Sequence, residues 1–200
     1  MEFQIKKAQY RHEPELFRLY KNVAGIADGI IRNENEIDQN LISEILKCSI
    51  ENGLILVGSI NDEVVGEIHA YTPDIFAFQH MLTDLTIIVD PKYQGQGIGR
   101  KLFKKFLSTV KTDLNHILRI ELYTREHNKR NVKFYESLGF INEGRQKNKI
   151  FVSDSVFETP LHMAWFNPNY SAENTKHNKN MANSHAKPTH LPNYWPYSNR

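Results

Sequence analysis

Residues 85–110 read LTIIVDPKYQGQGIGRKLFKKFLSTV, and this stretch decides the fold of the 200-residue chain. A run of apolar and β-branched residues ends at Asp90-Pro91, and a loop with glycines at positions 95, 97 and 99 follows it. From Ile98 onward apolar residues recur at helical spacing, with basic residues between them. The stretch therefore predicts a strand, a glycine-rich loop and an amphipathic helix in succession.

The glycine-rich loop has the features of an anion-binding site. Glycines let several backbone N–H groups approach one ligand, and the unpaired donors and dipole of a helix N-terminus favour negative charge. We therefore expect a bound phosphate or pyrophosphate. A P-loop is excluded because the chain has no Gly-Lys-Ser/Thr, which also argues against a nucleotide hydrolase. A dinucleotide-binding fingerprint is disfavoured because Leu102 and Arg100 occupy the positions where its third glycine would be needed.

The loop and a second segment downstream together resemble a known family. Residues 94–99, QGQGIG, resemble the Gln/Arg-x-x-Gly-x-Gly/Ala signature of the GNAT superfamily of acyl-CoA-dependent N-acetyltransferases. Residues 117–123 alternate as a strand, and a helix ending in KFYESLGF follows. Tyr135 lies seven residues after Asn128, and Gly139 is the expected left-handed stop, which resembles the second superfamily block. The resemblance covers about residues 54–165 and says little about the substrate.

The remaining sequence supplies further elements of the same fold. We expect a short strand at 3–7, helices at 14–23 and 34–49, strands at 54–60 and 64–71, and a final strand at 159–166. Asn33 is a plausible cap of the second helix, and Asn61-Asp62 marks a hairpin turn. The resemblance implies an α/β (α+β mixed) fold, with a central mixed, mostly antiparallel sheet and helices on both faces.

Composition predicts one domain at residues 1–166 and a polar extension, rich in Asn and Pro, at 167–200. The extension carries a net charge of +3, which leaves −1 on the preceding residues from the total of +2, so we expect no nucleic-acid partner. The aromatic residues Tyr194, Trp195 and Tyr197 belong either to a disordered end or to a segment that docks on the body or a partner.

Sequence features also favour a cytoplasmic location. The N-terminus has no apolar segment of the signal-peptide type, and no apolar run is long enough to span a membrane. The single Cys48 cannot form an internal disulfide, and we interpret it as a packing residue. We expect no membrane partner, and we leave a homodimer open.

The resemblance implies that the co-substrate is acetyl-CoA and assigns residues to it. Backbone groups of Ile87, Ile88 and Val89 would hold the pantetheine arm, with the Val89 amide as the oxyanion donor. The pyrophosphate would lie against the loop, formed by Gln94, Gly95, Gln96, Gly97, Ile98, Gly99 and Arg100. Asn128 would bind the pantetheine or phosphate region, and Tyr135 would return a proton to the departing thiolate.

Acetyl transfer to an amine also needs a group that takes up the amine proton. Asp84, at the beginning of the motif strand, is our first candidate for this base. His80 comes second because imidazole titrates near the working pH, and Glu121 on the neighbouring strand comes third. Here the chain departs from one subset of the superfamily, because Tyr123 occupies the position where that subset keeps its base.

The amine acceptor, a small molecule or a peptide, is not identified by the sequence. Strand alternation places Glu67, His69 and Tyr71 on one face, where they could line the acceptor pocket together with Glu121. We expect no metal, because neither His69 with His80 nor the histidines at 177, 185 and 190 have a tight ligand spacing. The alternative to an enzyme is a non-catalytic acyl-CoA-binding module that senses the cofactor or holds a partner.

Overall fold

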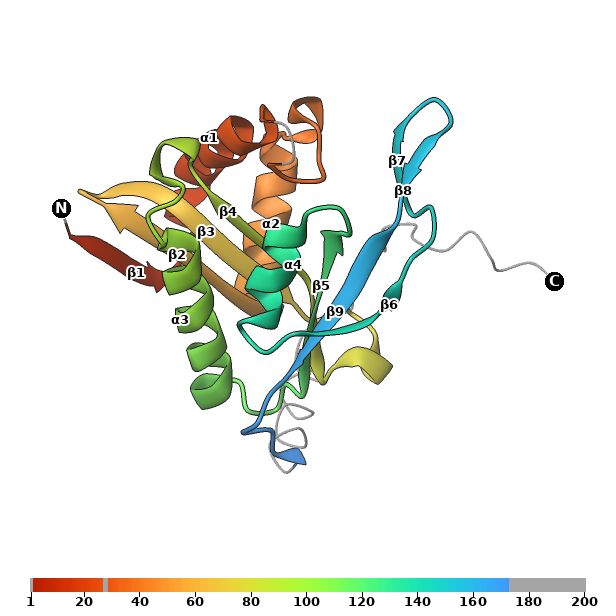
Figure 1. Cartoon of the computed structure of the whole chain (residues 1–200). Helices are drawn as coiled ribbons and strands as arrows, with labels where there is room; N and C mark the ends of the chain where they lie inside the picture. The colour runs from red at the N-terminus through yellow and green to blue at the C-terminus, as the bar shows by residue number, and fades with distance from the viewer. Residues whose placement is uncertain (1, 27–28, 173–200) are drawn as a thin grey trace.

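The computed structural model describes residues 2–26 and 29–172, which form a seven-stranded sheet between two layers of helices (Figure 1). The sheet order is β1-β2-β3-β4-β5-β9-β6, and every neighbouring pair is antiparallel except β4 with β5. Its strands are β1 (Phe3–Lys7), β2 (Gly53–Ile60), β3 (Glu63–Tyr71), β4 (Met81–Val89), β5 (Arg119–Arg125), β6 (Ile141–Arg145) and β9 (Pro160–Phe166). The predicted mixed, mostly antiparallel sheet is confirmed.

Within the described residues, four α-helices cover the sheet and divide the apolar core in two. Helices α1 (Glu13–Ala24) and α2 (Gln39–Asn52) pack on one face, with Leu16, Ile42 and Leu46 fully buried. Helices α3 (Ile98–Asp113) and α4 (Lys129–Glu136) pack on the other face, where Leu102 and Phe103 of α3 are also fully buried. None of the helices among the described residues has the length and apolar character that a membrane span requires.

Two turns predicted from local sequence have the expected backbone. Asn61 and Asp62, between β2 and β3, have φ values of 50° and 64°, which suits the tight turn of a hairpin. Gly139, which follows the end of α4 at Glu136 and its C-cap Ser137, has a φ of 92°, in the left-handed region that glycine adopts without a Cβ penalty.

The predicted helix at 34–49 begins later than expected. Residues Glu34–Glu36 form a separate 3-10 turn after Asn33, and Ile37 is extended and almost fully buried. Burial of the Ile37 side chain in the core pulls the backbone out of helical geometry at this point. The cap of α2 is therefore Asp38, whose Oδ1 accepts a hydrogen bond from the Leu41 N–H at 2.8 Å.

Two further strands were not predicted. Strands β7 (Ile150–Ser153) and β8 (Val156–Glu158) form a hairpin between β6 and β9, and this hairpin stands apart from the seven-stranded sheet (Figure 1).

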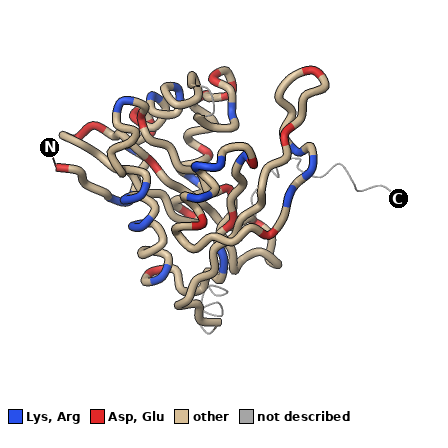
Figure 2. The backbone as a smooth tube through the Cα atoms, in the orientation of Figure 1, with Lys and Arg blue, Asp and Glu red and all other residues tan. Residues whose placement is uncertain are grey.

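Basic and acidic residues are interspersed along the described backbone, without one long segment of a single sign (Figure 2).

The sheet opens between its two parallel strands, and this opening positions the candidate site. β4 and β5 are paired only at Met81–Arg119 and Leu82–Ile120, after which the strands diverge (Figure 1). From residue 83 to 89, β4 is paired with β3 on one side and has no strand partner on the other among the described residues. The middle of the sheet therefore offers a free strand edge to a ligand.

Candidate active site

Asp84 lies in a bulge at the point where β4 leaves β5. His69 of β3 pairs with Thr86 whereas Tyr71 pairs with Thr83, so β4 carries one extra residue here. Asp84 itself has a φ of 53°, in the left-handed region, and its carboxylate is exposed. The Tyr71 hydroxyl donates a hydrogen bond to Asp84 Oδ2 at 2.8 Å. Burial, and then the nearby Asp84 charge, raise the pKa of Tyr71, so this hydroxyl keeps its proton.

Backbone polar groups at the end of β4 face the opening. The Asp90 N–H donates to the Val65 carbonyl of β3 at 2.8 Å, and successive residues of a strand direct their N–H groups to opposite sides. The Val89 N–H therefore points toward the open edge. The Val89 carbonyl points the same way and accepts a hydrogen bond from Gln94 Nε2 at 3.1 Å.

The glycine loop joins this edge to the N-terminus of α3. Gly95 and Gly97 have φ values of 77° and 78°, and a Cβ added at either would meet no heavy atom within 4 Å. Gly97 is the N-cap of α3, so the first N–H groups of the helix lack intrahelical partners. At Gly99 an added Cβ would lie 3.7 Å from Val89 Cγ2, which shows how closely α3 packs on the end of β4. The loop thus borders open space, as an anion site requires.

Helix α4 lies beside the start of α3 and carries two of the predicted residues. The Asn128 side chain caps α4 by accepting a hydrogen bond from the Asn131 N–H at 3.0 Å. Arg100 donates to the Ser137 hydroxyl at 3.1 Å, which ties the first turn of α3 to the end of α4. The Tyr135 ring lies 5.8 Å from that of Phe103, and burial raises the pKa of Tyr135 to about 12. Its hydroxyl is therefore protonated at neutral pH and can act as a proton donor.

The sheet face under α1 carries a buried polar cluster. Glu67 is fully buried and His69 is 3% exposed. Glu67 Oε1 lies 2.9 Å from His69 Nδ1, and Glu67 Oε2 accepts a hydrogen bond from the Tyr20 hydroxyl at 2.9 Å. The predicted shared face of Glu67, His69 and Tyr71 is confirmed, since the rings of His69 and Tyr71 are stacked. Tyr20 was not foreseen, and contact of Glu67 or His69 with an acceptor stays a prediction.

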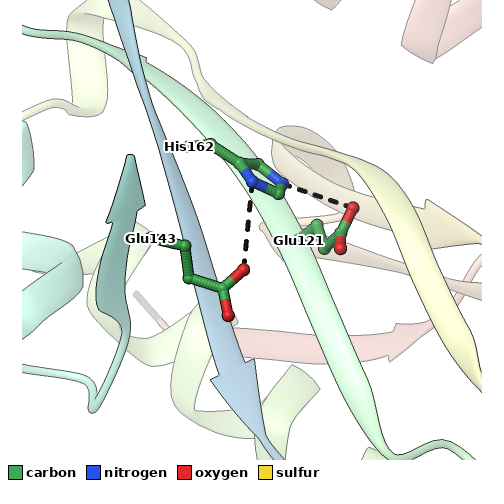
Figure 3. A group of neighbouring side chains, drawn as sticks. All are labelled: Glu121, Glu143 and His162. Atoms are coloured by element: carbon green, nitrogen blue, oxygen red, sulfur yellow. Dashed lines mark ion pairs between the residues drawn. The ribbon is translucent and has the colours of Figure 1, made fainter. Parts of the chain in front are cut away.

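A second polar cluster covers β5, β9 and β6 and includes the predicted Glu121. His162 lies between Glu121 and Glu143, with its Nε2 3.3 Å from Glu121 Oε2 and its Nδ1 3.9 Å from Glu143 Oε2 (Figure 3). These three side chains offer ligand atoms within 4.8 Å of one another, as a metal site would. Both carboxylates, however, already bind the Arg119 guanidinium, and a cation would have to displace it. The Arg119 guanidinium therefore already supplies the positive charge that these carboxylates bind.

The remaining candidates lie at the edges of this region. The His80 carbonyl accepts a hydrogen bond from the Leu118 N–H at 2.7 Å and so joins the beginnings of β4 and β5. Its role as a base stays a prediction. Burial and neighbouring carboxylates raise the pKa of the Cys48 thiol, which suits a packing residue. The tail aromatics at 194, 195 and 197 and the histidines at 177, 185 and 190 lie outside the described residues.

Solved structures share this fold. A GNAT-family acetyltransferase from Streptococcus pneumoniae superposes with a TM-score of 0.75, covers 82% of this chain and 99% of its own, and is 18% identical. The structure of yncA from Salmonella typhimurium with its cofactor acetyl-CoA gives a TM-score of 0.74 at 17% identity, over 86% of this chain and 98% of its own. At these identities the likeness concerns the fold.

Sequence comparison also finds relatives. The chain is 32% identical over 74 residues to a spermidine N(1)-acetyltransferase of Vibrio cholerae, a match that covers 37% of this chain and 42% of that protein. It is 28% identical over 94 residues to the Escherichia coli K12 enzyme of the same name, over 47% and 50% of the two chains. The chain spans about half the length of the curated relatives it matches. The model of the acetyltransferase (GNAT) family matches residues 15–140, and the chain belongs to this family.

Proposed function

We propose that the protein is an N-acetyltransferase that transfers an acetyl group from acetyl-CoA to a primary amine by direct attack in a ternary complex. The observation that carries this proposal is the free edge of β4, which ends at the glycine-rich N-terminus of α3. An extended amide-containing arm can add to such an edge as a short strand would, while the helix N-terminus binds the phosphates. Membership of the GNAT family supports the same assignment.

For the cofactor, we assign the pantetheine arm to the open side of β4. The backbone N–H groups of Ile87 and Val89 face this side. Because successive residues of a strand alternate, the backbone N–H of Ile88 points toward β3 instead. The pyrophosphate then lies against residues 94–100, where the added Cβ atoms at Gly95 and Gly97 find only open space. We assign Arg100, in the first turn of α3, to the phosphates, and Asn128, the N-cap of α4, to the pantetheine or phosphate region.

The chemistry divides among three groups. A lysine-like amine has a pKa of about 10.4 and must lose a proton before it attacks the thioester. Asp84 takes this proton, directly or through water, because its exposed carboxylate lies at the opening and is oriented by Tyr71. The Val89 N–H stabilises the oxyanion, and the protonated Tyr135 hydroxyl returns a proton to the departing thiolate.

The acceptor we infer is a small cationic amine, and the two curated relatives named above are spermidine acetyltransferases. On β5, Ile120 and Leu122 point into the core under α3 and α4, so Glu121 projects from the opposite face of the sheet. Glu121 is paired with Arg119, which leaves Asp84 as the carboxylate for an amine. Asp84 binds the hydroxyl of Tyr71, whose ring stacks on His69 on the side of the sheet away from α3 and α4. A carboxylate of this kind attracts and orients an ammonium group. A cytoplasmic location stays a prediction.

A panel of amines that includes polyamines, amino sugars and peptide N-termini, with release of free CoA thiol as the readout, tests this function. We expect turnover with at least one small cationic amine. Calorimetric titration of acetyl-CoA into the same preparation separates two failures. Tight binding without turnover on any amine would favour the non-catalytic acyl-CoA-binding module, whereas absence of binding would remove the cofactor assignment as well.

A further inference from the structure

The hairpin of β7 and β8 projects from the rest of the molecule (Figure 1), and several of its apolar side chains are exposed. Phe151 is 63% exposed and Phe157 50%, while Val152 and Val156 are 47% and 49% exposed. Phe151 and Phe157 are cross-strand partners whose rings lie 5.7 Å apart in an edge-to-face arrangement, so they form an apolar pair on one face of the hairpin, while strand alternation places Val152 and Val156 on the other face. Exposed apolar surface gathered in one place is typical of a binding interface.

Unpaired backbone adds to this surface. β7 pairs only with β8 among the described strands, so both outer edges of the hairpin present unpaired N–H and C=O groups. A two-stranded hairpin alone is marginally stable in water, and it gains stability when further strands or apolar residues cover it. The hairpin thus has both the apolar side chains and the free edges that a further β-strand would satisfy.

Two contacts fix the base of the hairpin to the main sheet. Arg125 of β5 donates from its Nη1 to both carboxylate oxygens of Glu158, each at 2.9 Å. The ammonium group of Lys149 lies 3.5 Å from the centre of the Tyr123 ring. Because the base is held in this way, the apolar part of the hairpin is kept away from the body of the protein.

We propose that this hairpin is a dimer interface, and that it binds the same hairpin of a second copy of the chain around a twofold axis. A twofold interface must be self-complementary. Lys147 stands at the base of the hairpin and Asp154 at its tip, and both are exposed. When two hairpins lie antiparallel, the Asp154 of each copy meets the Lys147 of the other. The charge pattern thus supports a second copy as the occupant. The inference goes beyond the proposed function and does not depend on it.

Sedimentation velocity of the full chain over a concentration series measures the dimer dissociation constant. The double variant Phe151→Ser/Phe157→Ser should weaken the dimer at least tenfold, because it removes the apolar pair on one face of the hairpin. Ile31→Ser is the matched control, since Ile31 is 57% exposed but lies outside the hairpin, and it should leave the constant unchanged. Thermal unfolding of each variant tests whether the chain is still folded.

A charge exchange tests the antiparallel arrangement separately. Lys147→Asp or Asp154→Lys alone should weaken the dimer by about fivefold, the effect of surface ion pairs that are lost twice in a symmetric interface. The combined variant Lys147→Asp/Asp154→Lys should restore the wild-type constant. A wild-type chain that stays monomeric, or a dimer that is insensitive to the hairpin substitutions, would overturn the proposal, including the case in which the hairpin binds a different protein.

Discussion

Substitution of Gly97 separates backbone strain from loss of ligand binding. Gly97 has a φ of 78°, and an added Cβ would meet no heavy atom within 4 Å. Gly97→Ala should therefore destabilise the fold through conformation alone, by about 1 kcal/mol. For a chain of this size, such a loss lowers the melting temperature by about 2–4 °C. Affinity for acetyl-CoA should change little, because the methyl group enters open space.

Gly97→Glu adds a negative charge to the same strain. A charge about 5 Å from a pyrophosphate oxygen, at an effective dielectric constant of about 20, costs about 3 kcal/mol. This corresponds to a loss of about 100-fold in acetyl-CoA affinity. Gly97→Gln is the neutral control of nearly the same size, and its loss should be much smaller. Gly99→Ala is a second control, because its Cβ would make only an ordinary contact with Val89 at 3.7 Å.

Isothermal titration calorimetry of acetyl-CoA into the wild type and the four variants measures these affinities, and thermal unfolding measures the strain. We expect the order wild type, Gly99→Ala and Gly97→Ala close together, then Gly97→Gln, then Gly97→Glu. Equal affinities for Gly97→Glu and the wild type, together with the expected drop in melting temperature, would refute the placement of the pyrophosphate at this loop.

Three further predictions concern the polar side chains. Tyr135→Phe should lower turnover by about tenfold to a thousandfold, with acetyl-CoA affinity nearly unchanged. Because the folded-state pKa of Tyr135 is raised to about 12, the contribution of this hydroxyl to the free energy of unfolding is present below about pH 10 and is lost as the pH rises toward 12. Between about pH 10 and 12 the Tyr135→Phe variant should therefore lose less stability than the wild type. If Asp84 is the base, Asp84→Asn should suppress turnover most at low pH, whereas His80→Gln should change the pH–rate profile only if His80 is the base. A profile set by the ionisation of the acceptor alone in both variants would exclude both residues. Tyr20→Phe should lower the free energy of unfolding, measured by urea titration, by about 1–3 kcal/mol, because it leaves one oxygen of the buried Glu67 without its hydrogen-bond donor. An unchanged urea concentration at half-unfolding would contradict this prediction.

Features determined by local sequence were predicted correctly. The left-handed turns at Asn61-Asp62 and Gly139 depend on residues that adopt positive φ, and the structure has them. The amphipathic α3 follows from apolar residues at helical spacing, which bury the same stripe in the core.

The start of α2 was misplaced because Asn33 and Asp38 are both good caps. Only the burial of Ile37 decides between them, and that is a tertiary contact.

Features that depend on strand register could not be predicted. His162, Glu143 and Arg119 are far from one another in sequence and meet because β9 pairs with both β5 and β6. Strand alternation predicts that these side chains point away from the core, but it does not predict which strands are neighbours in the sheet. The β7–β8 hairpin was missed because its strands are short and their apolar residues are exposed.

The left-handed backbone of Asp84 restricts which substitutions evolution or engineering can accept at this position. Among residues with side chains, Asn and Asp adopt φ near 53° most readily, and glycine does so freely. Glutamate offers the same carboxylate, yet it would carry an added backbone penalty and a longer reach. The substitutions that the backbone tolerates at Asp84 are therefore Asn and Gly, and both remove the negative charge. A library selected for folding alone should enrich those two residues here and deplete Glu.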